Sequence, residues 1–124
     1  MAQFIEGNHK AFLLPASLTN FEQYSRVVVS GGSLSLASST QREVGVLSRF
    51  PSVAGQPADV ILKTANGTVP MVAGGTISAY ANVFAAANGR ISQLDNSTAS
   101  SYTIGVALQA ATGAGDLVEV LRQD

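Results

Sequence analysis

The stretch QYSRVVVSGGSLSLAS, residues 23–38, decides the predicted fold because YANVFAAANGRISQLD, residues 80–95, repeats it in outline. Each stretch contains an apolar run, a short turn signal and a segment in which apolar and polar residues alternate. The turn signals are Gly31-Gly32 and Asn88-Gly89, dipeptides that accept positive φ as two-residue hairpin turns require. Both stretches are therefore predicted to form β-hairpins.

The likeness continues beyond the two hairpins. Residues 42–47, REVGVL, resemble residues 102–107, YTIGVA, and residues 58–62, ADVIL, resemble residues 115–120, GDLVEV. This last match places Asp59 and Asp116 at equivalent positions, each before a final strand. The matching blocks are about 57 to 60 residues apart. We therefore expect two pseudo-repeated halves, at about 21–66 and 67–124.

Most of the apolar segments are β-branched or aliphatic and are bounded by Gly, Ser, Pro or Asn, a pattern typical of strands. Gly45 and Gly105 each lie inside a predicted strand, where glycine is expected only at a bulge or where another backbone approaches closely. The predicted fold class is all-β: a small barrel or sandwich of short, bent strands. The sequence leaves open whether the halves form one barrel or two lobes.

Residues 77–87, ISAYANVFAAA, favour a helix when taken alone. They are rich in alanine, their apolar residues have helical spacing, and Asn88-Gly89 would form a helix C-cap. Their counterpart in the first half, RVVVS, is a poor helix former. The repeat therefore predicts a strand here.

Residues 1–20 show little periodicity and have no evident counterpart in the second half. They are predicted to form an extended N-terminal arm, followed by a β-rich domain over residues 21–124. The start of the chain lacks the basic and apolar regions of a signal peptide. No window approaches about 20 consecutive apolar residues, so we expect no membrane span and synthesis in the cytoplasm.

The composition excludes several kinds of site. The chain has no cysteine, so it offers neither a disulfide nor a thiolate metal ligand. Its seven basic residues are scattered among eight acidic ones, whereas binding to nucleic-acid phosphates requires clustered Lys and Arg. A chain that is this apolar and this poor in charge is expected to bury surface against protein partners.

No combination of residues predicts catalysis. His9 is the only histidine, and a triad or a metal site would need partners held around its ring. The acidic residues are separated, and an Asp beside a turn usually accepts hydrogen bonds from backbone N–H groups. The Gly-rich segments lack the lysine of a phosphate-binding loop. We therefore predict no catalytic residue, no metal site, no cofactor and no enzymatic activity.

The second half resembles the bacteriophage head-decoration, or capsid cement, proteins. The resemblance lies in Ala73-Gly74-Gly75-Thr76, residues 83–91, Ile104-Gly105-Val106-Ala107 and residues 110–120. Val44-Gly45-Val46-Leu47 is a weaker echo in the first half, so the likeness covers roughly residues 20–121. It implies a β-rich homotrimer that binds the major capsid protein at three-fold positions of the virion and braces the shell.

In such proteins the N-terminal arm commonly contacts the capsid. The residues of this arm that we expect at the capsid interface are Phe4, Ile5, His9, Phe12, Leu13 and Leu14. A few buried aromatic or aliphatic residues usually dominate an interface. The alternative that the apolar ones pack on the chain's own core remains open.

Two other functions remain open. The chain could be another virion subunit, of a tail tube, a head–tail connector or a fibre, because these are also small and β-rich. It could instead be a carbohydrate-binding β-module, although it has no Trp and only three Tyr to form a sugar platform.

Overall fold

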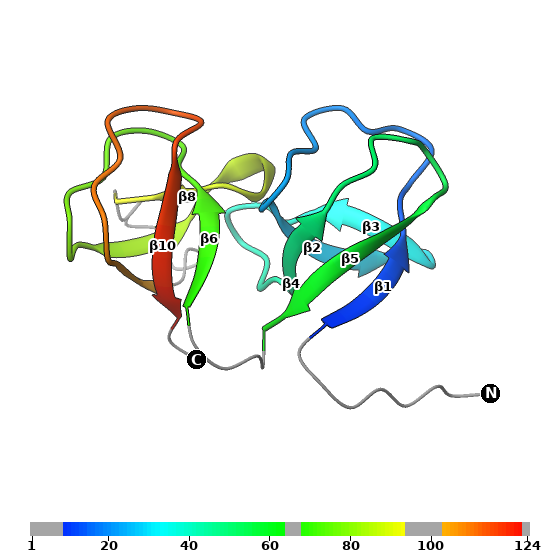
Figure 1. The fold of residues 1–124 in the computed structure, drawn as a ribbon, viewed down its shortest axis with the longest axis horizontal. Coiled ribbons are helices and arrows are strands. Elements are labelled where there is room, and N and C mark those ends of the chain that lie inside the picture. Colours follow the sequence, from blue (N-terminus) through cyan, green and yellow to red (C-terminus); the bar gives the residue numbers. More distant parts are fainter. Residues whose placement is uncertain (1–8, 64–67, 94–102, 123–124) are drawn as a thin grey trace.

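The computed structural model describes residues 9–63, 68–93 and 103–122, which form two antiparallel five-stranded sheets (Figure 1). The first sheet contains β1 (His9–Leu13), β2 (Arg26–Ser30), β3 (Ser33–Leu36), β4 (Gly45–Arg49) and β5 (Pro57–Leu62). The second contains β6 (Thr68–Val72), β7 (Asn82–Ala85), β8 (Ile91–Ser92), β9 (Thr103–Ala107) and β10 (Leu117–Arg122). A short 3₁₀ turn, η1 (Ala87–Gly89), lies between β7 and β8. The prediction of an all-β fold is confirmed.

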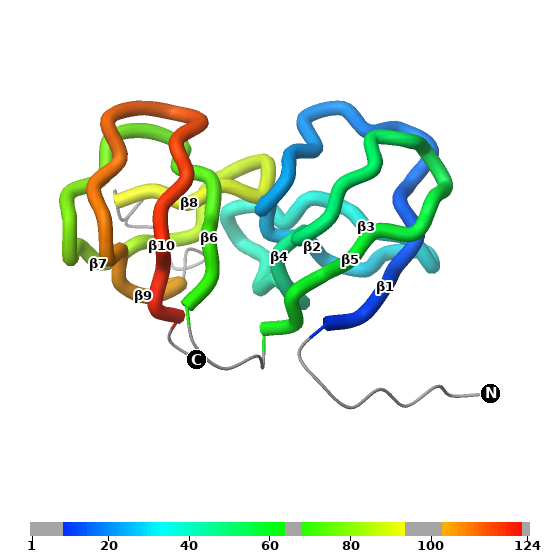
Figure 2. Tube along the Cα trace, in the orientation of Figure 1, coloured from blue at the N-terminus to red at the C-terminus, as the bar shows by residue number. Residues whose placement is uncertain are grey.

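The two sheets have the same topology. Their strand orders are β1-β5-β4-β2-β3 and β6-β10-β9-β7-β8, so each strand of the first sheet has a counterpart five strands later. We refer to residues 9–62 as the first half and to residues 68–122 as the second half. Figure 2 shows the two halves side by side. The predicted repeat is therefore present in the fold.

Backbone details repeat as well. Tyr24 and Tyr80 both have a positive φ, of 70° and 65° respectively. Tyr24 donates its N–H to the carbonyl of Leu47, and Tyr80 donates to the carbonyl of Ala107, its counterpart on β9. A positive φ is uncommon in a bulky residue. Its presence at the same place in both halves shows that the repeat extends to the loops.

The N-terminal segment is only partly outside the sheets. β1 pairs with β5 in the first sheet as β6 pairs with β10 in the second, so residues 9–13 have a counterpart in the second half. The expectation of an arm without a counterpart is wrong for these residues. The alternation in HKAFL is too weak to predict a strand, and β6 hides the match because it contains Pro70. Proline is tolerated there because β6 is an edge strand.

The two hairpin turns have the positive φ angles that the sequence predicts. Gly31 and Gly32 have φ of 63° and 84° and connect the paired residues Ser30 and Ser33. Asn88 and Gly89 have φ of 58° and 72°. The second turn is one residue longer, because Ala87 joins it to form η1.

The glycines inside β4 and β9 are explained by close backbone approach. A Cβ on Gly45 would overlap the carbonyl oxygen of Ile61, and a Cβ on Gly105 would overlap that of Leu121. The two glycines occupy equivalent positions, opposite Leu62 on β5 and Arg122 on β10. The neighbouring strand therefore provides the close backbone approach that the sequence predicts at these two glycines.

The ambiguous segment 77–87 contains a strand. Residues 82–85 form β7, which pairs with β8 and β9, and Ile77 forms an isolated bridge with Ala111. The helical spacing of its apolar residues is thus misleading. Val83 and Ala85 point into the core because they alternate along a strand.

Each half has its own apolar core. The core of the first half contains Leu14, Val27, Leu34, Leu47, Ala58 and Val60. The core of the second half contains residues of all five of its strands, and also Val46 from β4 of the first half. The sequence left one barrel or two lobes open; the structure has two open sheets, each with a core, joined through β4.

Candidate functional site

The contact between the halves is built around Arg26, the first residue of β2. Its side chain is completely buried, which is rare for an arginine. Nε donates to the carbonyl of Arg90 at 3.1 Å, and Nη2 donates to the carbonyl of Ala86 at 2.8 Å. Both acceptors flank η1, so one side chain of the first half holds the turn of the second.

The same guanidinium also binds its own half. It donates to the carbonyls of Ser38 at 3.3 Å and Gln41 at 3.4 Å, and Nη1 lies 3.6 Å from Oε1 of Glu43. Glu43 is buried too, with 4% of its surface exposed. A buried charge must be paired and hydrogen-bonded to be tolerated. Arg26 therefore acts as a fixed connection between the two halves.

Two further arginines support this junction. Arg122, the last residue of β10, donates from Nη1 to the carbonyl of Leu62 at 3.2 Å. Burial lowers the pKa of Arg122, and the negative charge of Glu43 opposes that shift. Arg90 donates from Nε to Oε1 of Glu22 at 2.9 Å. Each contact joins a charged group of one half to an acceptor of the other.

Gly89 allows η1 to approach β2. A Cβ there would lie 2.7 Å from the carbonyl oxygen of Arg26, and the N–H of Gly89 donates to the carbonyl of Ala37 at 2.9 Å. The turn signal at Asn88-Gly89 thus has a second role, because the small residue also makes the junction close. In Figure 1 the coil of η1 projects toward the first half.

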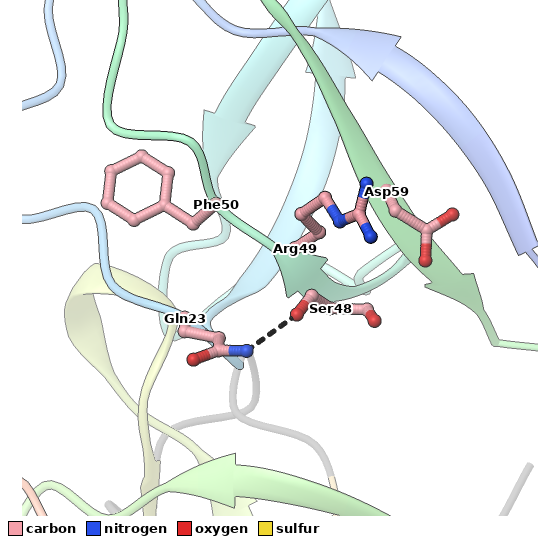
Figure 3. A pocket seen from close by; sticks show the side chains of 5 residues that line it. All are labelled: Gln23, Ser48, Arg49, Phe50 and Asp59. Atoms are coloured by element: carbon pink, nitrogen blue, oxygen red, sulfur yellow. Dashed lines mark hydrogen bonds between the residues drawn. The ribbon is translucent and has the colours of Figure 1, made fainter.

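One open surface depression of about 650 Å³ lies beside the end of β4 and is lined by Gln23, Ser48, Arg49, Phe50 and Asp59 (Figure 3). Gln23 donates from its amide to the carbonyl of Ser48 at 2.8 Å, and the ring of Phe50 points away from the other side chains. The lining is mostly polar. It contains one carboxylate and no histidine, so it lacks the paired groups that general acid–base catalysis needs.

Of the six residues predicted for a capsid interface, the four that the structure describes do not share one exposed surface. Phe4 and Ile5 lie outside the described residues. Leu14 is buried in the core of the first half and Phe12 packs against that core, so the alternative of packing on the chain's own core holds for these two. His9 and Leu13 are exposed on β1. Leu14 therefore has no surface to offer a partner.

His9 has a partner within the first half. Its Nδ1 lies 2.6 Å from Oδ2 of Asp59, on the neighbouring strand β5. The equivalent pair in the second half is Thr68 and Glu119, in which the hydroxyl donates to Oε2 at 2.6 Å. Asp59 and Glu119 bind equivalent residues and occupy equivalent positions in the strand pairing, so Asp59 corresponds to Glu119. The predicted equivalence of Asp59 and Asp116 is wrong by three residues, because short valine-rich strands align in several registers.

Asp116 lies in the turn before β10, as the sequence predicts for a carboxylate that binds backbone N–H groups. Its Oδ2 accepts hydrogen bonds from the hydroxyl of Thr112 at 2.8 Å and from the N–H of Thr112 at 2.9 Å. These bonds, that of the hydroxyl foremost, lower the pKa of Asp116. Asp116 therefore stabilises the turn in its charged form.

Replacing Asp116 with Asn is expected to destabilise the protein at neutral pH and to have little effect in acid. Because the folded pKa is lowered, the stabilisation is fully present above the unfolded pKa of about 3.9 and is lost as pH falls through the folded pKa. Thermal unfolding of both proteins between neutral and strongly acidic pH measures this. A difference in stability that does not depend on pH would contradict the prediction.

Other kinds of site lack support in the described part of the chain. Within residues 9–63, 68–93 and 103–122, no group of three or more His, Cys, Asp or Glu side chains could hold a metal ion. In those same ranges no helix has the length and apolar character needed to cross a lipid bilayer. What the surface does offer is exposed apolar side chains, among them Leu13, Val29, Val53, Leu117 and Leu121.

The comparison with protein families identifies the family of the chain. The family model of phage cement proteins matches residues 20–122, which include every strand except β1. The chain belongs to this family. The resemblance inferred from the glycine and alanine pattern is thereby confirmed, and a structural role associated with the phage capsid follows from it. A search of curated proteins found no match.

For a protein with a structural role associated with the phage capsid, the candidate functional residues are on the surface, where exposed apolar side chains often mark contacts with other proteins. Sequence reasoning missed Arg26 and Glu43 because both looked like isolated surface charges. The one available signal was the contrast between Arg26 and Asn82, its counterpart at the start of β7.

Proposed function

We propose that the chain is a capsid decoration protein that trimerises on the outer surface of a phage head, binds the major capsid protein and stabilises the shell. The observation that carries this proposal is the family match over residues 20–122. In this role the protein is made in the host cytoplasm, joins the virion from outside and has no catalytic task. A charge-poor surface with exposed apolar side chains suits such binding.

The capsid contact includes the exposed side of β1 together with the residues that precede it. His9, Ala11 and Leu13 alternate along β1 and are exposed, and Leu13 retains half of its surface. Phe4 and Ile5 belong to the same proposed contact. Three such contacts in one trimer can raise avidity about 10²–10⁴-fold over a single contact.

The direct test is cosedimentation of the purified protein with expanded capsids that lack it. We expect saturable binding and a higher temperature of capsid disruption when the protein is present. Electron microscopy of the decorated particle should then place the protein on the shell. Failure to bind capsids, or density at the tail, would overturn the proposed function and favour another virion subunit.

Replacing Leu13 with Asp is expected to weaken capsid binding by roughly tenfold or more, because a carboxylate in an apolar contact loses its hydration without gaining a partner. Val53→Asp is the matched control, since Val53 is equally exposed but lies in the loop between β4 and β5. Binding curves for the two variants measure their affinities for the capsid. Equal affinities would remove β1 from the proposed contact.

A further inference from the structure

Part of the outer face of the first sheet is covered by the second half. Arg26, Val46 and Ile61 are neighbours across β2, β4 and β5, and we call these three residues the docking row. Val46 is fully buried in the core of the second half, and Ile61 packs against that core. Arg26 binds the carbonyls on both sides of η1. The docking row thus joins the first half to the second.

The second half has the same row, and there it is exposed. Asn82, Val106 and Leu121 are neighbours across β7, β9 and β10, at the positions that correspond to the docking row. We call them the open row. Leu121 is 49% exposed, Asn82 is exposed and Val106 is only partly buried. The chain itself therefore leaves uncovered a face that it buries in the other half.

The surface that receives the docking row, which we call the receiving surface, shows the opposite asymmetry. In the second half it includes η1, where Gly89 is buried next to Arg26, and Ala85 at the end of β7, which belongs to the same buried cluster as Val46. Their counterparts in the first half are Val29 and Gly32, at the end of β2 and in its turn, and both are exposed. Val29 retains 44% of its surface. Each half thus has one of the two complementary surfaces free.

We propose that the open row of one chain docks on the receiving surface of the first half of a second copy, beside Val29 and Gly32. This contact repeats between chains the contact that the docking row makes within the chain. The proposal rests on the self-association that is part of the proposed function, and it names the surfaces responsible. The occupant is a second copy because Val29 and Gly32 of this chain correspond to Ala85 and Gly89, which receive the docking row within the chain.

The contact joins two different surfaces, so it is heterologous. Such contacts close into rings when the rotation between copies allows it, and otherwise grow into filaments. Three copies would place six similar halves in one ring, alternating contacts within and between chains. The homotrimer of the proposed function is the closed form of this arrangement.

The contact between chains should be weaker than the contact within the chain. Asn82 occupies the place of Arg26, and its short, uncharged amide cannot reach several carbonyls at once as a guanidinium does. The pair Arg90–Glu22 is also absent there, because the counterpart of Arg90 is Ser33. A reversible assembly of folded chains follows from these differences.

The test compares two variants that each carry a carboxylate on one surface. Leu121→Asp alters the open row, and Val29→Asp alters the receiving surface. Native mass spectrometry and light scattering at micromolar concentration should show an oligomer for the unchanged protein and weakening of its association by roughly 100-fold or more in each variant. The controls are Leu117→Asp and Val53→Asp, which alter similarly exposed residues outside both surfaces.

Mixing the two variants tests the heterologous geometry. Each retains one intact surface, so an equimolar mixture should form a 1:1 dimer and nothing larger. A contact in which the same surface meets itself would not give this result. All four altered residues are exposed, so thermal unfolding should confirm that every variant folds like the unchanged protein.

Three outcomes overturn the inference. They are an unchanged protein that is monomeric, variants that assemble as well as their controls, and a mixture that remains monomeric. None of these depends on capsid binding. A monomer that binds capsids would refute the inference and the proposed trimer but leave the capsid role standing, whereas an oligomer that cannot bind capsids would refute only the proposed capsid role.

Discussion

Replacing Arg26 with Met is expected to lower the free energy of unfolding by about 3–5 kcal/mol, because it removes the buried guanidinium that lies 3.6 Å from the buried carboxylate of Glu43. The carbonyls of Ala86 and Arg90 also lose their donor. For a chain of this size the melting temperature should fall by about 10–20 °C. Thermal and denaturant unfolding, followed by circular dichroism, measure both quantities.

Two further variants serve as controls for Arg26→Met. Arg49→Met removes an exposed arginine from β4 and should change stability by no more than about 0.5 kcal/mol. Arg26→Lys keeps the charge but lacks the planar fork, so it should lie between the unchanged protein and Arg26→Met. If Arg26→Met were no less stable than Arg49→Met, the junction would not depend on the guanidinium.

Gly45→Ala and Gly105→Ala are each expected to destabilise the protein by about 3 kcal/mol. The added methyl group would overlap a carbonyl oxygen of the neighbouring strand, that of Ile61 or of Leu121, and backbone cannot move aside as a flexible side chain can. The two effects should be similar because the two sites are equivalent in the repeat. Denaturant unfolding of the two variants measures them.

Gly75→Ala is the matched control for these glycine variants. A Cβ at Gly75 would meet no atom within 4 Å, and its backbone does not have the positive φ that disfavours other residues. It should therefore change stability by less than about 1 kcal/mol, with either sign. Equal losses at Gly45, Gly105 and Gly75 would mean that close approach is not the reason for glycine in β4 and β9.

Turn chemistry and the repeat were sufficient to predict much of this fold. Gly31-Gly32 and Asn88-Gly89 adopt positive φ, as their residue types require, and β7 is a strand despite its helical spacing. The comparison with RVVVS was decisive for β7 because alanine-rich segments carry little strand propensity of their own. Local preference and the global fold agree at the two turns, whereas β7 is a strand through its pairing with β8 and β9.

β1 was not predictable in the same way. Its residues have no clear alternation, and what makes them a strand is pairing with β5, which lies about 50 residues away in the chain. Tertiary pairing of this kind overrides local propensity. Leu14 was consequently placed at an interface, although it completes the core of the first half.

The junction was harder still to predict. Burial of a charge can be inferred only when its partners are known. Two acceptors of Arg26, the carbonyls of Ala86 and Arg90, lie 60 and 64 residues away in the chain, and two others, those of Ser38 and Gln41, lie 12 and 15 residues away. Carbonyl acceptors leave no trace in a sequence. The exposed apolar residues of the candidate surfaces were equally hidden, because exposure depends on which half covers which.

The sharing of Val46 between the halves has a consequence for how the chain is made. The first half leaves the ribosome first and contains every residue of its own core, so it can fold while synthesis continues. The core of the second half needs Val46 as well as its own strands. Until the second half folds, Arg26 lacks the carbonyl acceptors of Ala86 and Arg90, so these hydrogen bonds form only when η1 docks on the first half. The first half therefore serves as a template on which the second half is completed.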